Sequence, residues 1–191
     1  MKKFVLASML SMIAGAAQAS WTLDSAASKL EFVSVKKETV VETHHFSALS
    51  GAIDDKGKAT LAIDLNSVNT NIDIRNERMK TVLFDTANYP TAKVKTKVQL
   101  SGLQAMKAGE SYEQPLYAKM KLHGVAQQLL ANVRVTKVSD TVIEVSTIEP
   151  ITINSADYGL DTGIEQLKTI AKLPSIKLTV PVSFTLRYSA N

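Results

Sequence analysis

The chain has 191 residues, of which 45% are hydrophobic and 21% are charged, and it contains no cysteine. A formal net charge of +4 is too small to indicate a nucleic-acid partner. The lack of cysteine excludes disulfides, thiol redox chemistry and cysteine-ligated metals. The length suits a single domain with a sizeable core.

Residues 1–19 are expected to be a cleaved signal peptide. Lys2 and Lys3 precede a short apolar run, and Ala17-Gln18-Ala19 fits the small-x-small pattern at which such peptides are cut. The run is shorter than the ~20 residues needed to span a bilayer, although an uncut N-terminal anchor is the alternative. We therefore expect an exported chain, residues 20–191, that does not span a membrane and forms one domain.

Alternation of apolar and polar residues predicts strands through most of the remaining chain. In the clearest case every second residue from Ile176 to Tyr188 is apolar. The predicted strands lie at 29–36, 45–53, 59–65, 93–100, 115–122, 129–138, 142–153 and 175–189. Eight or nine strands with mostly short links favour one antiparallel sheet closed into a barrel, or a sandwich.

Two segments change to helical spacing. The first has a helical stripe made of Ile72, Arg75, Met79 and Leu83. In the second, Thr162 and Glu165 resemble a capping box, and Pro174 ends the helix. Both helices are short and lie between strands, so we expect two helical insertions that cover an open end of the barrel.

The three histidines are the first candidates for chemistry. His44 and His45 are neighbours in a predicted strand, so they point to opposite faces unless a bulge intervenes. His123 alternates with outward lysines unless the turn at Gly124 re-aims it. This geometry disfavours a three-histidine zinc site and favours structural histidines, with a pH-sensing or headgroup role left open.

No sequence pattern points to catalysis. The chain has neither a Gly-x-Ser-x-Gly elbow nor a glycine-rich phosphate loop. The segment 157–160, Asp-Tyr-Gly-Leu, is interpreted as a turn with a packed tyrosine and not as a site. We therefore expect no enzymatic activity.

The first helical segment concentrates Arg75, Arg78 and Lys80. The simplest interpretation is the wet face of an amphipathic helix. Alternatively, Arg75 and Arg78, one turn apart on one face, bind a polar headgroup or fix the helix to the barrel rim.

The inward face of the predicted barrel carries many small or medium side chains, namely Ala48, Ala59, Ile63, Val94, Ala118, Val180 and Val182. Side chains either fill the lumen of an eight-stranded barrel or leave room for one ligand. The small residues favour a cavity, and a solid core is the alternative.

Several short motifs together resemble the signature of the YceI-like family of exported bacterial proteins. They are Phe46 with Gly51, Ser67-Val68-Asn69-Thr70, Arg75-Asn76, Phe84-Asp85, Tyr89-Pro90, "LHGVAQQL" at 122–129, and "ADYGL" at 156–160. Asn76 stands where the family commonly has aspartate. The resemblance extends over essentially all of the chain that follows the signal peptide.

This resemblance implies an all-β fold, a lipocalin-like antiparallel barrel of eight strands. It further implies a periplasmic protein that holds a polyisoprenoid or an isoprenoid quinone in the lumen and requires no cofactor. Combined with the strand pattern, it predicts lumen contacts from Phe32, Phe46, Ile63, Val94, Met120, Leu178, Val180 and Phe184. Arg75 and Arg78 are expected at the mouth, near the headgroup.

Two other functions stay open at this point. One is a metal-dependent enzyme built on His44, His45 and His123. The other is a ligand-free interaction protein of the cell envelope under stress, which would have a filled barrel. A homodimer is also compatible with the sequence.

Overall fold

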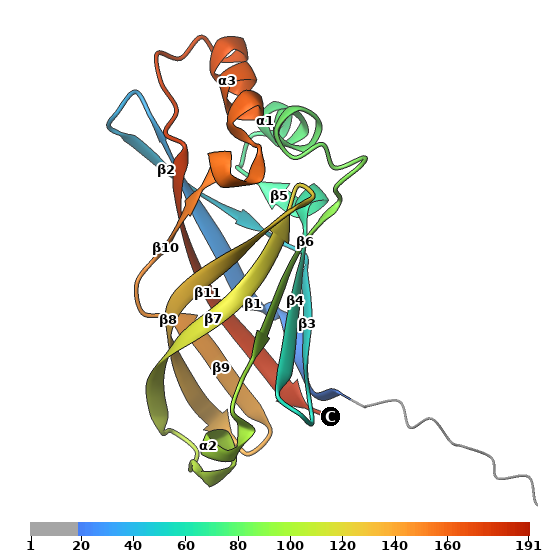
Figure 1. Ribbon diagram of the computed structural model, residues 1–191. Helices are drawn as coiled ribbons and strands as arrows, with labels where there is room; N and C mark the ends of the chain where they lie inside the picture. The colour runs from blue at the N-terminus through green and yellow to red at the C-terminus, as the bar shows by residue number, and fades with distance from the viewer. Residues whose placement is uncertain (1–18) are drawn as a thin grey trace, which may run out of the picture.

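The computed structural model describes residues 19–191 (Figure 1). The expected signal peptide, residues 1–19, lies outside the described residues except for its last position. Strands make up most of the described part, and the buried apolar residues form one core cluster, most of whose members lie on the strands.

Eight strands close into a barrel (Figure 1). They are β1 (Ala19–Lys36), β3 (Leu49–Asp54), β4 (Lys58–Asp64), β6 (Thr91–Lys97), β7 (Ser111–Leu122), β8 (Val125–Ser139), β9 (Val142–Thr147) and β11 (Thr179–Ala190). Each pairs antiparallel with the next, and β11 pairs with β1 to complete the ring. The predicted eight-stranded antiparallel barrel is confirmed, and the sandwich is excluded.

Two of the predicted strands are broken. The segment 45–53 divides into β2 (Val40–Phe46) and β3, which pair with different parts of β1. At the break the N–H groups of Ser47 and Ala48 donate to Ser67, at its carbonyl and its Oγ respectively. The segment 142–153 divides into β9 and β10 (Ile151–Asn154) around Pro150, which has no N–H to donate.

The first strand is longer than its alternation indicates. β1 begins at Ala19, well before the predicted start at 29. Trp21 and Leu23 belong to it, but the register shifts between Asp24 and Lys29, so the period is interrupted. A bulge of this kind hides a strand from a search for strict alternation.

Helical segments lie at both ends of the barrel. At one end, α1 (Asp73–Arg78) continues into a π-helical turn, η2 (Met79–Leu83), and α3 (Asp161–Ile170) packs beside it (Figure 1). We call α1, η2 and α3 the cap. The short strand β5 (Val68–Asn69) and the 3-10 turns η1 (Leu65–Ser67) and η3 (Ser155–Tyr158) connect the cap to the barrel. The two predicted insertions are thus confirmed.

A third helix, α2 (Leu100–Ala105), lies at the opposite end (Figure 1). The predicted strand 93–100 was too long, because β6 ends at Lys97 and the chain turns to bury Leu103. One and a half turns of helix are too short to establish a helical period in the sequence.

The predicted capping box of the second insertion is wrong. The helix α3 begins at Asp161, so Thr162 lies inside it, and the N-cap is Leu160, which makes no side-chain capping bond. Leu160 is instead buried against the barrel. Tertiary packing therefore sets the start of this helix in place of a local cap.

Gly163 allows α3 to lie close to η2. A Cβ at this position would stand 2.9 Å from the carbonyl oxygen of Val82 and 3.0 Å from the Cα of Leu83. Both of these are backbone atoms, which move only if the two segments separate. The absence of a side chain at Gly163 thus sets the spacing within the cap.

We predict that Gly163→Ala lowers the free energy of unfolding by about 1 kcal/mol or more, because overpacking outweighs the gain in helix propensity. Urea unfolding followed by circular dichroism measures the effect. Gly102→Ala in α2 is the matched control, since a Cβ there meets no atom within 4 Å. The control should match or exceed the wild type, and an equally stable Gly163→Ala would contradict the account.

Candidate ligand-binding site

An apolar cavity of about 230 Å³ lies inside the barrel, between the strands and the cap. The cap and its flanking residues contribute Met79, Leu83, Phe84, Leu160 and Ile164 to the wall. An engineered apolar cavity of about 150 Å³ in another protein stays dry and binds benzene. A larger cavity with a similar lining is suited to a hydrocarbon.

Small residues opposite large ones keep this space open. The wall includes four buried alanines, namely Ala59, Ala92, Ala118 and Ala131. Ala92 lies across the sheet from Ile63, and Ala131 lies across from Leu116. The lumen is therefore not filled, and the solid-core alternative does not hold.

Seven of the eight predicted lumen residues line the cavity. They are Phe32, Phe46, Ile63, Val94, Met120, Val180 and Phe184. That they contact a ligand stays a prediction, while their position on the wall follows from strand alternation. The sequence reasoning did not single out Ala92, Ala131 or the cap residues, although Ala92 lies in phase with Val94 on β6.

The placement of Leu178 on the wall is wrong. It precedes β11 and is 36% exposed. Its carbonyl accepts hydrogen bonds from the N–H and the Oγ of Ser155, at 2.9 and 2.8 Å. The regular pairing of β11 with β10 starts only at Thr179, so the alternation of β11 does not extend to Leu178.

An aromatic row forms the wall near the cap. The ring of Phe46 lies 5.2 Å from that of Phe32 and 5.9 Å from that of Phe84, between centroids. These residues come from β2, β1 and the segment after η2. Tilted contacts at such distances are favourable beyond the area they bury, so the row ties the cap to the barrel.

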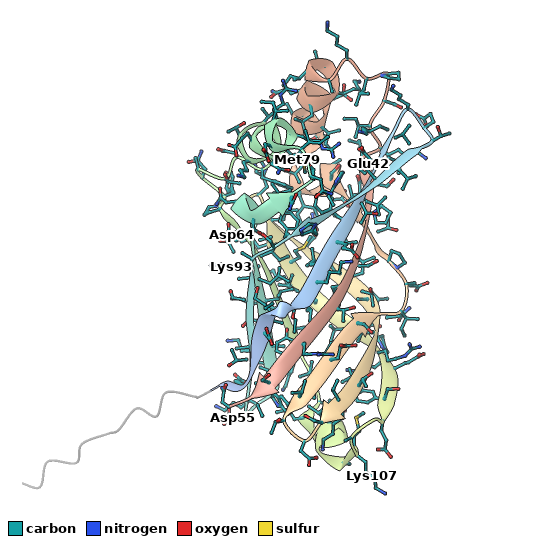
Figure 2. The ribbon with its side chains drawn as sticks, turned by 180° about the vertical axis from the view of Figure 1, so that it is seen from behind. Glu42, Asp55, Asp64, Met79, Lys93 and Lys107 are labelled. Carbon is teal, nitrogen blue, oxygen red and sulfur yellow. The ribbon has the colours of Figure 1, made fainter. Side chains whose placement is uncertain are left out.

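Arg75 joins the cap to the β1–β2 hairpin (Figure 2 labels Glu42 and Met79). Its Nη1 donates to the Oε2 of Glu42 at 2.9 Å and its Nη2 to the carbonyl of Thr70 at 2.7 Å. Lys36 also bonds to Glu42. The hydrogen bond from Lys36, together with the charge of Arg75, holds the pKa of Glu42 below its usual value.

Arg75 thus fixes the helix to the barrel rim, which is one of the roles predicted for the arginines. Arg78 is half-buried and forms no ion pair within residues 19–191. A headgroup contact from either arginine stays a prediction. Asn76 accepts from both the N–H and the Oγ1 of Thr70, at 2.8 and 2.7 Å, and so performs the acceptor role available to the aspartate common in the family signature.

His44 is buried beside the aromatic row. It is 3% exposed, its ring centroid lies 5.2 Å from that of Phe32, and its Nε2 lies 2.9 Å from the Oγ of Ser34. Burial lowers its pKa to about 4, and the charge of Arg75 acts in the same direction. His44 is therefore neutral at pH 7, as expected of a structural histidine.

The other two histidines lie elsewhere. His45 is on the opposite face of β2 from His44, as alternation predicts. His123 occupies the turn between β7 and β8 with φ of 49°, followed by Gly124 at 81°, which gives a tight two-residue hairpin turn. Its ring lies 4.5 Å from that of Tyr89, so the turn re-aims it.

These positions do not assemble a metal site. In the part of the chain that the structure describes, no three His, Cys, Asp or Glu side chains are arranged to hold a metal ion. The metal-enzyme alternative has no geometric support there. The Asp157–Leu160 segment forms a turn around Tyr158, which is 2% exposed, as the sequence predicted.

Within residues 19–191, no helix combines the length and the apolar character needed to cross a membrane. The three α-helices have 6, 6 and 10 residues. They serve as covers for the two barrel ends.

The family model described as the YceI-like domain matches residues 21–188. The chain belongs to the YceI-like family. The resemblance seen in the sequence motifs is thereby confirmed, and the match includes part or all of every barrel strand and the whole cap. A comparison with curated protein sequences finds no match.

Solved structures similar to this YceI-like chain include a polyisoprenoid binding domain from Saccharophagus degradans implicated in plant cell wall breakdown. It is 45% identical, with a TM-score of 0.89, and the match covers 91% of this chain and 100% of that one. BcnA from Burkholderia cenocepacia is 21% identical, with a TM-score of 0.65 and coverage of 86% and 98%. The second likeness concerns the fold alone.

The lowered pKa of His44 predicts a loss of stability in acid. An unfolded histidine has a pKa of ~6.5, so the unfolded chain binds the extra proton as the pH falls from 6.5 towards 4, and folding becomes less favourable. Between pH 7 and pH 4.5, we predict that the unfolding free energy of His44→Gln falls by roughly 1 to 2 kcal/mol less than that of the wild type. Urea unfolding at several pH values measures this difference.

The matched control is His45→Gln, which changes a neighbouring histidine on the other face of β2. It should keep the acid-dependent loss of the wild type. A His44→Gln variant whose unfolding free energy falls with pH as steeply as that of the wild type would contradict the assignment.

Proposed function

We propose that this protein is a periplasmic carrier that holds the hydrocarbon chain of an isoprenoid lipid, a polyisoprenoid or an isoprenoid quinone, in the barrel lumen. The observation that carries the proposal is the apolar cavity of about 230 Å³. The polyisoprenoid binding domain from Saccharophagus degradans, at 45% identity, supports the same class of ligand.

The wall suits a branched, flexible chain. Burying each CH₂ group contributes about 0.8 kcal/mol, so a few isoprene units provide a substantial binding energy. Met79 and Met120 lie on the wall, and methionine adapts to irregular shapes because its side chain is unbranched and polarisable. Bent isoprenoid chains would require such adaptation.

The cavity wall offers few polar groups that could bind a headgroup. Ser155 already donates to the carbonyl of Leu178. Burial raises the pKa of the Tyr188 phenol to about 12, so it stays protonated and does not act as a base at neutral pH. We infer that the hydrocarbon enters the lumen while the headgroup stays outside, and that the protein binds its ligand without chemical change.

The periplasmic location rests on the first residues. Lys2 and Lys3, the apolar run and Ala17-Gln18-Ala19 have the order of an export signal cut after Ala19. An exported carrier without cysteine folds unchanged in an oxidising compartment. Isoprenoid lipids are components of membranes, so a carrier in that compartment would have access to them.

We predict that organic extraction of the purified protein, followed by mass spectrometry, yields an isoprenoid lipid, and that Ala118→Phe lowers the yield at least about tenfold. The new ring occupies the lumen beside Met120 and removes space for the chain. Circular dichroism checks that the variant folds.

Ala52→Phe is the matched control, because Ala52 lies on β3 one position before the buried Ile53 and does not line the cavity. It should retain the lipid of the wild type. Recovery of no isoprenoid from the wild type, or equal recovery from Ala118→Phe, would refute the proposal.

A further inference from the structure

Six lysines project from the outer surface of β4, β6 and β7, and we call this surface the lysine face. They are Lys58, Lys93, Lys95, Lys97, Lys119 and Lys121, and all six are exposed. Figure 2 places Lys93 on the outside of the barrel below the cap. They form three directly opposed cross-strand pairs, Lys58 with Lys97, Lys95 with Lys119, and Lys93 with Lys121.

Pairing of like charges across strands destabilises a sheet, and this surface does little to relieve it. None of the six forms an ion pair with any residue in the described range 19–191. The positions directly opposite three of the lysines are uncharged: Thr60 and Ala62 face Lys95 and Lys93, and Gln128 faces Lys119. Two carboxylates lie at the margin of the face, Asp64 at the end of β4 and Asp54, whose Oδ1 accepts from the N–H of Lys58, but neither forms an ion pair with the six lysines. The folded barrel alone does not account for this arrangement.

The lysine face also polarises the whole molecule. The sequence has 22 Lys and Arg and 18 Asp and Glu. Without Lys2, Lys3 and the six lysines of the face, 14 positive side chains remain against the 18 negative ones. The rest of the chain therefore carries a net negative charge. The resulting separation of charge turns the lysine face towards negatively charged surfaces.

Two exposed apolar residues adjoin the lysines. Tyr117, which is 71% exposed, precedes Lys119 by two positions on the same side of β7, and Leu130, 52% exposed, lies opposite it on β8. A tyrosine beside lysines is typical of surfaces at a membrane interface, where the ring lies at headgroup level and the ammonium groups meet phosphates.

We propose that the lysine face docks this protein on the surface of an anionic phospholipid bilayer. The proposal rests on the proposed function, because a carrier of an isoprenoid lipid exchanges its ligand with a membrane. From Lys93 to Lys97 the face extends about 13 Å along β6, and none of its six lysines lines the lumen cavity. A broad array of headgroups matches this shape, and Tyr117 and Leu130 favour lipid over a nucleic acid or an acidic protein.

Vesicle co-sedimentation of the full mature chain tests the proposal. The wild type is expected to bind vesicles that contain about one third phosphatidylglycerol, to bind poorly to pure phosphatidylcholine, and to be released by salt. Each lysine near an anionic surface contributes about fivefold to the affinity, so Lys95→Glu should weaken binding about 30-fold. In the same variant the new carboxylate faces Lys119 and should raise the melting temperature.

Two variants distinguish an effect of the lysine face from an effect of the net charge of the protein. Lys95→Arg keeps the positive charge and should keep vesicle binding. Lys107→Glu makes the same charge change at an exposed position in the link between α2 and β7, and should leave the affinity within about twofold of that of the wild type.

Four results would overturn the proposal. They are equal binding to anionic and neutral vesicles, unchanged binding by Lys95→Glu, equal losses in Lys95→Glu and Lys107→Glu, and stronger binding to polyglutamate or duplex DNA than to vesicles of equal charge. Loading with solanesol, a polyisoprenoid alcohol, is measured separately in the absence of vesicles. Lys95→Glu should load like the wild type, whereas failure of both to load would contradict the proposed function and not the docking of the face.

Discussion

Closure of the sheet between β1 and β11 is the constraint on which the cavity depends. The two strands pair from Trp21 with Ala190 to Phe32 with Val182, across one shift in register. Closure leaves the eight strands of the ring without open edges, and the interior of an eight-stranded ring is just wide enough for side chains to fill or for one small ligand to occupy. Ala59, Ala92, Ala118 and Ala131 face this interior, so the geometry of the ring produces a cavity where an open sheet would have collapsed.

The cavity also depends on the cap, which is a separate helical unit but supplies part of the cavity wall. Its apolar side chains complete the lumen, while its polar contacts involve residues that do not line the cavity: Arg75 bonds to Glu42 on the hairpin, and Asn76 bonds to Thr70, which precedes α1. The same end thus combines an apolar interior with charged ties at the rim. A ligand with a hydrocarbon chain and a polar head has this same division.

The sequence predicted the barrel well because alternation is a local signal. Each strand reports its own buried face, so seven lumen residues, from Phe32 to Phe184, could be placed without knowledge of their partners. Properties that depend on partners were out of reach. The break between β2 and β3 depends on Ser67, 20 and 19 positions away from Ser47 and Ala48 in sequence. For Arg75 the sequence is compatible with a solvated helix face, a headgroup contact or a tie to the rim, and the tie depends on Glu42, which lies 33 positions away in sequence.

Local signals also failed where geometry changes at a strand end. Leu178 continues the sequence alternation of β11, but the strand itself begins only at Thr179. His123 lies in a turn with positive φ, so its side chain leaves the face on which Lys119 and Lys121 lie. The lysine face shows the opposite case. Each row of lysines looks like an ordinary wet strand face, and only the pairing of β4 with β6 and of β6 with β7 reveals that the charges oppose one another.

The central claim is that the lumen holds an isoprenoid chain, and native mass spectrometry of the protein purified from its native source, with no lipid added, tests it most directly. The account predicts a species heavier than the bare chain by the mass of one isoprenoid lipid, which is released intact on collisional activation. A spectrum that contains only the bare chain, or a phospholipid or fatty acid in place of an isoprenoid, would contradict it.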